Sequence, residues 1–204
     1  MRKRNPWVSI SDLLSSVLLV ILLLFVIAVI VPKYSEEVKE KTQEDLRLEM
    51  MEQISETLIE YQQNNQILVN TDTGVLEFTD ATFSSGSAVV NPATAGIVQK
   101  LAGTLKIYMD NNPAMEILIE GHTDPAVVGS VRNAGGYFAN NIQLSALRAA
   151  NVRETLLSVL GKDYSSRIGV AGYGDTRLKD PAKPLSPENR RVELRILWNG
   201  NDKG

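Results

Sequence analysis

One carboxylate of this 204-residue chain stands at the start of a long apolar run. Asp12 directly precedes residues 13–31, and Ser15 and Ser16 follow it within about one helical turn, on the same helical face. A carboxylate that faces other protein at a membrane boundary can alternate between a neutral and a charged form, and so can carry an ion. Asp12 is therefore a candidate ion-conducting residue, and Ser15 and Ser16 are candidates to line the ion path.

Asp12 also has a structural interpretation. Ser9 would be the N-cap of the helix, and Asp12, three residues later, would be its partner in a variant of the capping box. The residue types fit both interpretations equally well. A single span cannot form a conduit by itself, so ion conduction would also require a partner protein with further membrane helices.

Other chemistry has little support in the residue types. His122 is the only histidine, and Asp124 lies two residues away, so the pair does not supply the nucleophile, base and orienting group of a hydrolytic triad. A metal site would need more ligands than these two residues. The absence of cysteine excludes disulfides and thiolate sites, and a net charge of −3 does not suggest nucleic acid. We expect no enzyme, no catalytic residue, no metal and no cofactor.

Residues 11–32 are predicted to form a membrane-spanning helix. At ~1.5 Å per residue, residues 13–31 would extend about 28 Å, close to the ~30 Å hydrocarbon thickness of a bilayer. Basic residues 2–4 precede the run and acidic residues 36–37 follow it, so the positive-inside rule places residues 1–10 in the cytoplasm. The alternative is a cleaved signal peptide, but the run is long for one and no small-x-small cleavage site follows.

Residues 33–65 are predicted to continue as a helical linker, because they contain neither proline nor glycine. Their apolar residues recur at spacings of four and three and form one stripe: Leu46, Met50, Ile54, Leu58 and Tyr61. Such a narrow seam suits a parallel homodimer. A helix that packs on the following domain would show the same pattern.

Residues 66–200 are predicted to form one α+β domain, a mixed sheet with helices on one face. A hairpin is expected around the turn at residues 71–74, and further strands at 115–120, 167–171 and 191–198. Helices are expected after the Asn91-Pro92 pair and over residues 144–160.

Four motifs in this domain carry a resemblance to a known family. They are Gly121-His122-Thr123-Asp124, Leu144-Ser145-Ala146-Leu147-Arg148-Ala149, Tyr173-Gly174 and Asn189-Arg190-Arg191-Val192-Glu193. In this order, over about 120 residues, they resemble the signature of the OmpA-like peptidoglycan-binding domain.

The resemblance implies a binding site for the diaminopimelate of the wall peptide. Asp124, preceded by Thr123, would accept from the ammonium group of that amino acid, and Arg148 would hold its carboxylate in a two-point contact that a lysine could not reproduce. Asn189 and Arg191 would line the same pocket. Residues 125–143 form a longer insertion than outer-membrane members have, which is similar to the MotB branch and could cover the pocket.

The N-terminal half resembles the same branch. An Asp early in a single N-terminal span is typical of stator B subunits, flagellar MotB and the ZorB subunit of Zorya anti-phage systems. In those proteins the Asp binds the transported ion, and two B spans sit inside a ring of five polytopic A subunits. The resemblance implies a bacterial inner-membrane homodimer with a periplasmic wall-binding domain, a MotA- or ZorA-like partner, and H⁺, or else Na⁺, as the transported ion.

The resemblance favours a stator subunit of an ion-driven motor, in a Zorya-like rather than a flagellar setting because the linker contains no separate plug segment. Two other functions remain open on the residues alone. A passive tether would use the span only to attach a wall-binding module, with Asp12 as a helix cap. A sensor would transmit wall contact through the geometry of a dimer.

Overall fold

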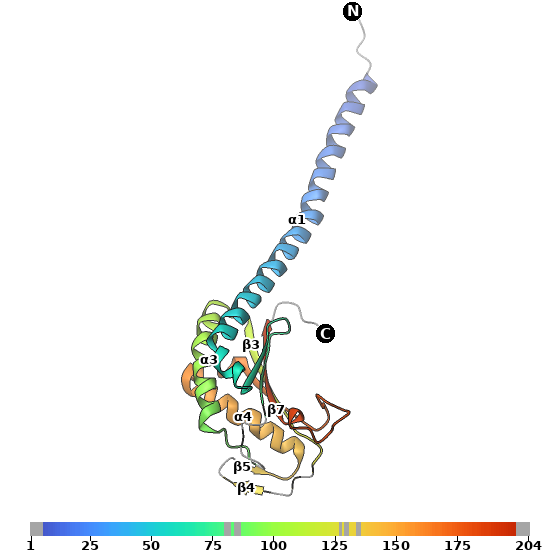
Figure 1. Cartoon of the computed structure of the whole chain (residues 1–204). Helices are drawn as coiled ribbons and strands as arrows, with labels where there is room; N and C mark the ends of the chain where they lie inside the picture. The colour runs from blue at the N-terminus through green and yellow to red at the C-terminus, as the bar shows by residue number, and fades with distance from the viewer. Residues whose placement is uncertain are drawn as a thin grey trace, which may run out of the picture. The chain divides into compact units, whose positions relative to one another are not determined.

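A computed structural model describes residues 6–79, 83, 87–126, 128, 131–133 and 136–198 of the chain. The chain divides into two compact units, Met1–Leu46 and Arg47–Gly204 (Figure 1). Helix α1 (Pro6–Thr57) runs through the first unit and contributes its last turns to the second.

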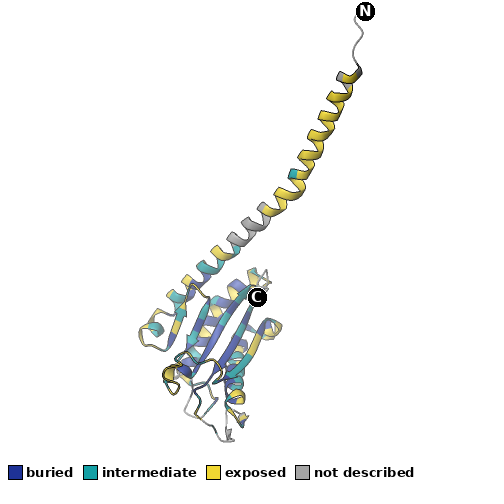
Figure 2. Cartoon of the chain, turned by 90° about the vertical axis from the view of Figure 1, so that its right-hand side faces the viewer, coloured by how far each residue is buried: buried dark blue, intermediate teal, exposed yellow. Residues whose placement is uncertain are grey.

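The first unit contains the apolar helix expected from the sequence. Residues Ile10–Lys33 are long and apolar enough to cross a membrane, and their 24 residues extend about 36 Å at ~1.5 Å per residue. Figure 2 shows that this stretch is exposed almost throughout. Such exposure of apolar side chains is typical of a helix whose surface contacts lipid. Helix α1 already begins at Pro6, so Ser9 lies inside the helix and the expectation that Ser9 is its N-cap is wrong.

The second unit is built on a five-stranded sheet in the order β1-β2-β7-β3-β6. Its strands are β1 (Ile67–Asn70), β2 (Val75–Phe78), β3 (Met115–His122), β6 (Ile168–Gly174) and β7 (Arg191–Trp198). Neighbours pair antiparallel except β3 and β6, which are parallel. The predicted mixed sheet and the hairpin of β1 and β2 are thus confirmed.

Two long helices cover one face of this sheet, as the sequence predicts (Figure 1). They are α3 (Pro92–Asn111) and α4 (Asn141–Leu160). The side chain of Asn91 caps α3 by accepting from the Thr94 N–H, with Pro92 at the first helical position. Shorter elements complete the unit: α2 (Ile59–Gln63), η2 (Lys162–Arg167) and η3 (Pro187–Asn189).

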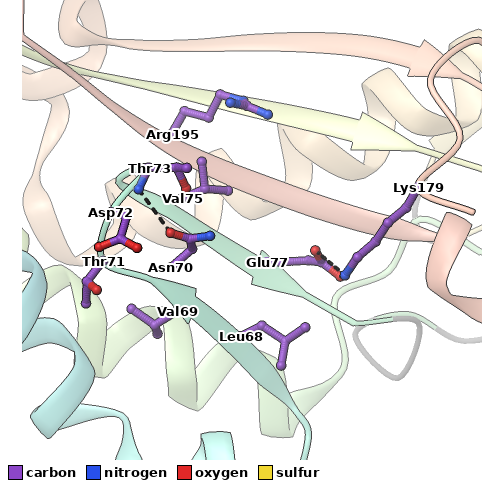
Figure 3. A pocket seen from close by; sticks show the side chains of 10 residues that line it. All are labelled: Leu68, Val69, Asn70, Thr71, Asp72, Thr73, Val75, Glu77, Lys179 and Arg195. Atoms are coloured by element: carbon purple, nitrogen blue, oxygen red, sulfur yellow. Dashed lines mark hydrogen bonds and ion pairs between the residues drawn. The ribbon is translucent and has the colours of Figure 1, made fainter.

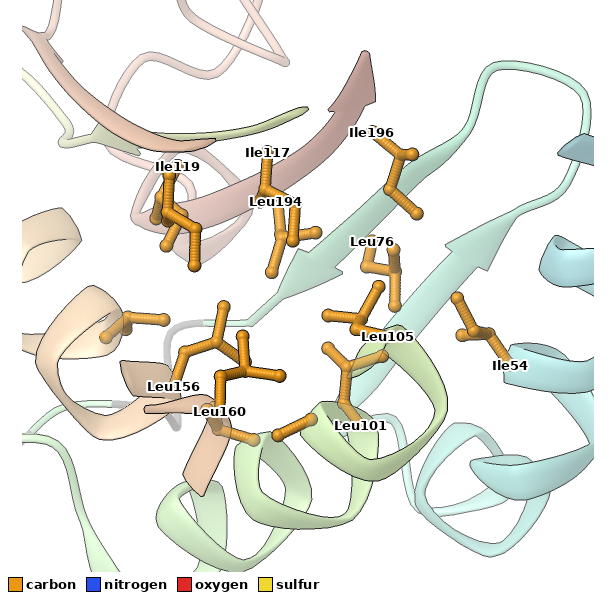
Figure 4. Packing of buried hydrophobic residues seen from close by; sticks show 14 of the residues in the cluster. Ile54, Leu76, Leu101, Leu105, Ile117, Ile119, Leu156, Leu160, Leu194 and Ile196 are labelled. Atoms are coloured by element: carbon orange, nitrogen blue, oxygen red, sulfur yellow. The ribbon is translucent and has the colours of Figure 1, made fainter. Parts of the chain in front are cut away.

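The hydrophobic core lies between this sheet and the helices (Figure 4). Strand β7 alternates, so that Val192, Leu194 and Ile196 face the helices and Trp198 packs partly against them. These residues meet Leu101 and Leu105 of α3, together with Leu156 and Leu160 of α4.

The end of α1 belongs to this core. Met50, Met51, Ile54 and Leu58 are fully buried in it, and Arg47 donates from Nη1 to the carbonyl of Thr71 at 3.2 Å. The apolar stripe of residues 33–65 was compatible with a dimer seam or with packing on the following domain. The structure shows packing on the domain. The stripe from Met50 onward is therefore not free to form a dimer seam, and the folded unit begins at Arg47 rather than at residue 66.

The insertion at residues 125–143 has structure of its own. Strands β4 (Val131–Asn133) and β5 (Gly136–Phe138) pair antiparallel as a separate two-stranded ribbon. Phe138 is fully buried and packs with Ala88 and Leu144, which ties this ribbon to the start of α4.

Candidate functional site

The loop that follows β3 holds the first two residues of the expected site. The N–H of Thr123 donates to the carbonyl of Gly174 at 2.9 Å, which fixes the loop to β6. The side chain of Asn141, at the start of α4, donates to the carbonyls of Asp124 and Ala126. Asp124 is only 8% exposed, so the loop presents a carboxylate that is largely withdrawn from water.

The carboxylate of Asp124 is already engaged. Its Oδ1 accepts from the Ala126 N–H at 3.2 Å, and its Oδ2 accepts from Nη1 of Arg190 at 2.7 Å. Arg190 comes from the junction of η3 and β7 and is 28% exposed at its side chain. Of the two adjacent arginines in the motif, the family resemblance implied Arg191 as a pocket residue. The structure places Arg190, rather than Arg191, against Asp124.

Arg148 is positioned by an unusually close contact between α4 and the sheet. A Cβ on Gly172 would lie 2.5 Å from the Ala146 nitrogen, so only glycine permits this approach. Ser145 secures it, because its Oγ accepts from the Gly174 N–H and donates to the carbonyl of Ile142, both at 2.9 Å. The Leu-Ser pair of the sequence motif therefore has a packing role that fixes the next turn of the helix.

Arg148 itself is 5% exposed and contacts the segment between β2 and α3. Its Nε donates to the carbonyl of Ser87 at 2.9 Å, and its guanidinium lies 4.9 Å from the centre of the Phe83 ring. One turn later, Asn151 donates to the carbonyl of Ala88 at 2.8 Å. The second expected site residue is thus also held by protein groups, which lie in a segment outside the four sequence motifs.

The other two expected residues have different neighbours. Asn189 is fully buried and uses its amide to close the preceding loop, by donating to the carbonyls of Lys183 and Pro184 at 3.0 and 2.8 Å and by accepting from the Asp180 N–H at 2.9 Å. Arg191 is buried and donates from Nε to Glu193 at 2.7 Å. Both residues therefore stabilise the loop and sheet beside Asp124.

The sheet face opposite the helices carries a network of charges. Arg195 bridges Glu120 and Glu193, with nitrogen–oxygen distances of 2.5 Å to each. Burial raises the pKa of Glu193, but the hydrogen bond and positive charge of Arg191 and the charge of Arg195 outweigh it, so that the pKa is lowered. The Glu193 carboxylate is thus held ionised by two arginines.

His122 lies beside this network and is 2% exposed. Burial, together with the positive charge of Arg191, lowers its pKa to about 4 against the opposing effect of Glu193 and Glu120. Its ring stacks on Tyr173 at a centroid distance of 5.5 Å, and within the described part of the chain neither ring nitrogen has a hydrogen-bond partner. His122 is therefore neutral at physiological pH.

Glu120, His122 and Glu193 offer ligand atoms that lie within 4.8 Å of one another, as a metal site would require. However, Arg191 and Arg195 already neutralise both carboxylates. A divalent cation would have to displace these guanidinium groups or lie among them, which Coulomb repulsion opposes. We interpret the group as a buried ion-pair network.

Two hollows lie on this face of the sheet. One, of about 540 Å³, is bounded by the β1–β2 hairpin, Arg195 and the Lys179–Glu77 ion pair of 2.7 Å (Figure 3). The second, of about 430 Å³, shares Leu68, Glu77 and Lys179 with the first and extends to Glu188 and Arg190. Arg190 therefore stands between Asp124 and an open volume.

The candidate ion-path residues lie in the other unit. Asp12 is in the second turn of α1 and is exposed, as are Ser15 and Ser16. Ser16 donates from Oγ to the backbone carbonyl of Asp12 at 2.6 Å, which leaves the Asp12 carboxylate uninvolved in this contact.

Comparison with known proteins identifies the second unit. A model described as the OmpA family matches residues 82–192, which include the first three sequence motifs and the fourth as far as Val192. No curated protein matches the chain at a significant level.

Several solved structures have a similar fold. A MotB-like protein from Desulfovibrio vulgaris has a TM-score of 0.54 and 21% identity, over 78% of this chain and 98% of that one. The cell wall anchor of the T6SS from Pseudomonas aeruginosa has a TM-score of 0.54 and 20% identity, over 71% and 96%. The periplasmic domain of Helicobacter pylori MotB has a TM-score of 0.51 and 23% identity, over 63% and 75%. At these identities the similarity establishes the fold.

Proposed function

This chain belongs to the OmpA family, and from that premise we propose that it is a peptidoglycan-anchored stator subunit of an ion-driven motor in the inner membrane. The apolar helix Ile10–Lys33 spans the membrane with the N-terminus in the cytoplasm, and Arg47–Gly204 lies in the periplasm. The similarity of this fold to MotB periplasmic domains and to a cell wall anchor supports the assignment.

The observation that carries wall binding is the pair of nearly buried, opposite charges in the OmpA motifs. Asp124 and Arg148 are 8% and 5% exposed, and each is held in place by protein groups, Asp124 by Arg190 and Arg148 by the Ser87 carbonyl. A diaminopimelate side chain ends in one ammonium and one carboxylate, which complement Asp124 and Arg148 respectively. Thr123 lies beside Asp124 with a buried Oγ1 that has no partner among the described residues, so it is available to such a ligand.

Wall binding can be tested with the full-length protein in detergent and isolated sacculi. We expect Asp124→Asn and Arg148→Lys each to lower co-sedimentation more than roughly tenfold, because each removes a charge-assisted or two-point contact. Glu154→Gln, on the exposed side of α4, is the matched control and should bind as the wild type does. Binding that survives in both site variants would contradict the assignment.

For the motor, we propose that Asp12 carries the ion, H⁺ or else Na⁺, at the interface with a polytopic MotA- or ZorA-like subunit, in a 5:2 ring with two copies of this chain. One observation speaks against a helix cap: Asp12 lies in the second turn of α1 and not at the start of the helix. The unbroken course of α1 through residues 33–57 favours a Zorya-type defence motor over a flagellar one.

Asp12→Asn tests this role when the chain is expressed with its neighbouring polytopic subunit. The expected result is loss of ion flow into cells under an inward proton or sodium gradient, with assembly and sacculus binding unchanged. Ser11→Ala, one residue away, is the control. Normal ion flow in Asp12→Asn would reduce the protein to a passive tether between membrane and wall.

A further inference from the structure

Ile142 is an exposed apolar residue in the first turn of α4. Its side chain is 45% exposed, and among the residues that the structure describes it belongs neither to the hydrophobic core nor to the cluster around Phe138. The first turn of a helix has free backbone N–H groups and favours polar residues, such as Asn140, which here accepts from the Gln143 N–H at 2.9 Å. Core packing therefore does not account for an isoleucine at this position.

The helical face that carries Ile142 directs it to the end of the sheet. Ala146, four residues later, lies on the same face and packs against Gly172 of β6. One turn earlier, Ile142 lies over Gly174, the last residue of that strand. Its Cδ1 is 3.0 Å from the position that a Cβ on Gly174 would take. The isoleucine thus extends over the edge of the sheet at which the site loop begins.

Two hydrogen bonds hold this end of α4 beside Asp124. The carbonyl of Gly174, the residue against which Ile142 packs, accepts from the Thr123 N–H at 2.9 Å. Asn141, directly before Ile142, donates from Nδ2 to the carbonyl of Asp124 at 3.2 Å. The exposed isoleucine therefore borders the loop whose carboxylate is proposed to bind the ammonium group of the wall peptide.

The proposed ligand has an apolar part that such a surface would suit. Diaminopimelate joins its charged end to the peptide through three methylene groups, and at ~1.5 Å per C–C bond all three lie within about 5 Å of the ammonium nitrogen. A site that held only the charged end would leave these groups in water, whereas an adjacent apolar side chain removes them from it. We propose that Ile142 contacts these methylene groups, and that the site thereby selects the aliphatic chain as well as the charges.

The test changes the side chain and the ligand together. The full-length protein in detergent is titrated with a soluble muropeptide that contains meso-diaminopimelate, and with the same peptide carrying a hydroxyl on the central methylene group. The wild type should bind the hydroxylated peptide roughly three- to tenfold more weakly, because the hydroxyl would lose water against an apolar side chain. Ile142→Ser should bind the parent peptide roughly three- to tenfold more weakly than the wild type does, and should bind the two peptides within about twofold of each other.

The same helix supplies the matched control. Val159 is 43% exposed near the other end of α4, and Val159→Ser should bind both peptides as the wild type does. Ile142→Leu keeps an aliphatic side chain and should keep the preference for the parent peptide. The heat capacity change of binding is a second readout. It should be less negative in Ile142→Ser than in the wild type, because less apolar surface leaves water on binding.

The inference rests on the proposed wall binding, but the two can fail separately. If the wild type binds neither peptide, both are wrong. If the wild type binds the two peptides equally well, only the role of Ile142 is overturned. It is also overturned if Ile142→Ser binds more weakly but keeps the preference of the wild type, since Ile142 would then support the loop without contacting the ligand.

Discussion

The backbone carbonyl of Ser145 lies so close to the α-carbon of Gly121 that any β-carbon at Gly121 would overlap it. Gly121 is the penultimate residue of β3, and Ser145 lies in the first turns of α4, one helical turn before Arg148. The contact brings α4 onto the sheet at the point where both proposed ligand-binding residues arise. The glycine of the Gly-His-Thr-Asp motif is thus a packing requirement.

Gly121→Ala should lower the free energy of unfolding by about 3 kcal/mol or more, because overpacking against backbone atoms cannot be relieved by a rotamer change. Urea unfolding measures it. Gly103→Ala is the matched control, since a Cβ on Gly103 of α3 would meet nothing within 4 Å. That variant should be more stable by about 0.5–1 kcal/mol. Equal stability of the two variants would contradict the close contact.

Ile54 and Ile59 are two isoleucines of the predicted linker segment that differ in burial, and so they form a matched pair for mutation. Ile54 is fully buried in the core, and Ile59 is 53% exposed. We expect Ile54→Ala to cost about 2–5 kcal/mol and Ile59→Ala less than about 1 kcal/mol. If residues 46–61 instead formed a dimer seam, the melting temperature of the wild type would depend on protein concentration, and Ile54→Ala would abolish that dependence.

His122 should make the protein less stable in mild acid. Its pKa is about 4 in the folded protein, against about 6.5 for an unperturbed histidine. Between these values the unfolded chain binds a proton that the folded protein does not, so stability should fall as the pH drops from about 6.5 to 4. The full effect is about 3 kcal/mol.

The measurement is urea unfolding at several pH values for the wild type and His122→Gln. The glutamine variant should lose this slope between pH 6.5 and 4. Glu193 acts below that range, because its lowered pKa means that its contribution is lost only as the pH falls below about 4.5. If the unfolding free energy of His122→Gln depends on pH as steeply as that of the wild type, another group takes up the proton.

Arg191→Gln should damage the fold rather than the ligand site. It leaves Glu193 with only Arg195, which is 41% exposed at its side chain, as a counter-ion. We expect a loss of about 2–4 kcal/mol in stability. Muropeptide affinity, measured below the melting temperature, should stay within about twofold of the wild type. A variant of normal stability that binds poorly would instead support the role in the ligand pocket that the family resemblance implies for Arg191.

The fold could be predicted from the sequence to the extent that local patterns determine it. The alternation in β7, the Asn91-Pro92 cap and the turn at residues 71–74 each indicate their own structure, and the structure confirms them. The surface against which Met50 and Ile54 pack could not be predicted in the same way. One apolar stripe suits a partner helix and a domain surface alike, and only the assembled core shows which surface it covers.

The sequence predicts which residues belong to the candidate site, but not which of them contact one another. Asp124 and Arg148 stand in motifs that can be read along the chain, whereas the contact of Asp124 with Arg190 joins residues that are far apart in sequence. Adjacent arginines of one motif look alike in sequence. What separates them is position and partner: Arg191 begins β7 and bonds to Glu193 of the same strand, whereas Arg190 precedes the strand and bonds to Asp124.

The burial of Met50, Met51, Ile54 and Leu58 has a mechanical meaning if the protein holds a motor still. Tension along α1 would enter the periplasmic unit through a helix whose side chains are interlocked with the sheet and α3. To pull that helix out, a force would have to slide several close-packed side chains past their neighbours at once, whereas a flexible tether would simply extend. No flexible segment therefore separates the end of α1 from the core, and a torque on α1 would be transmitted directly to the domain.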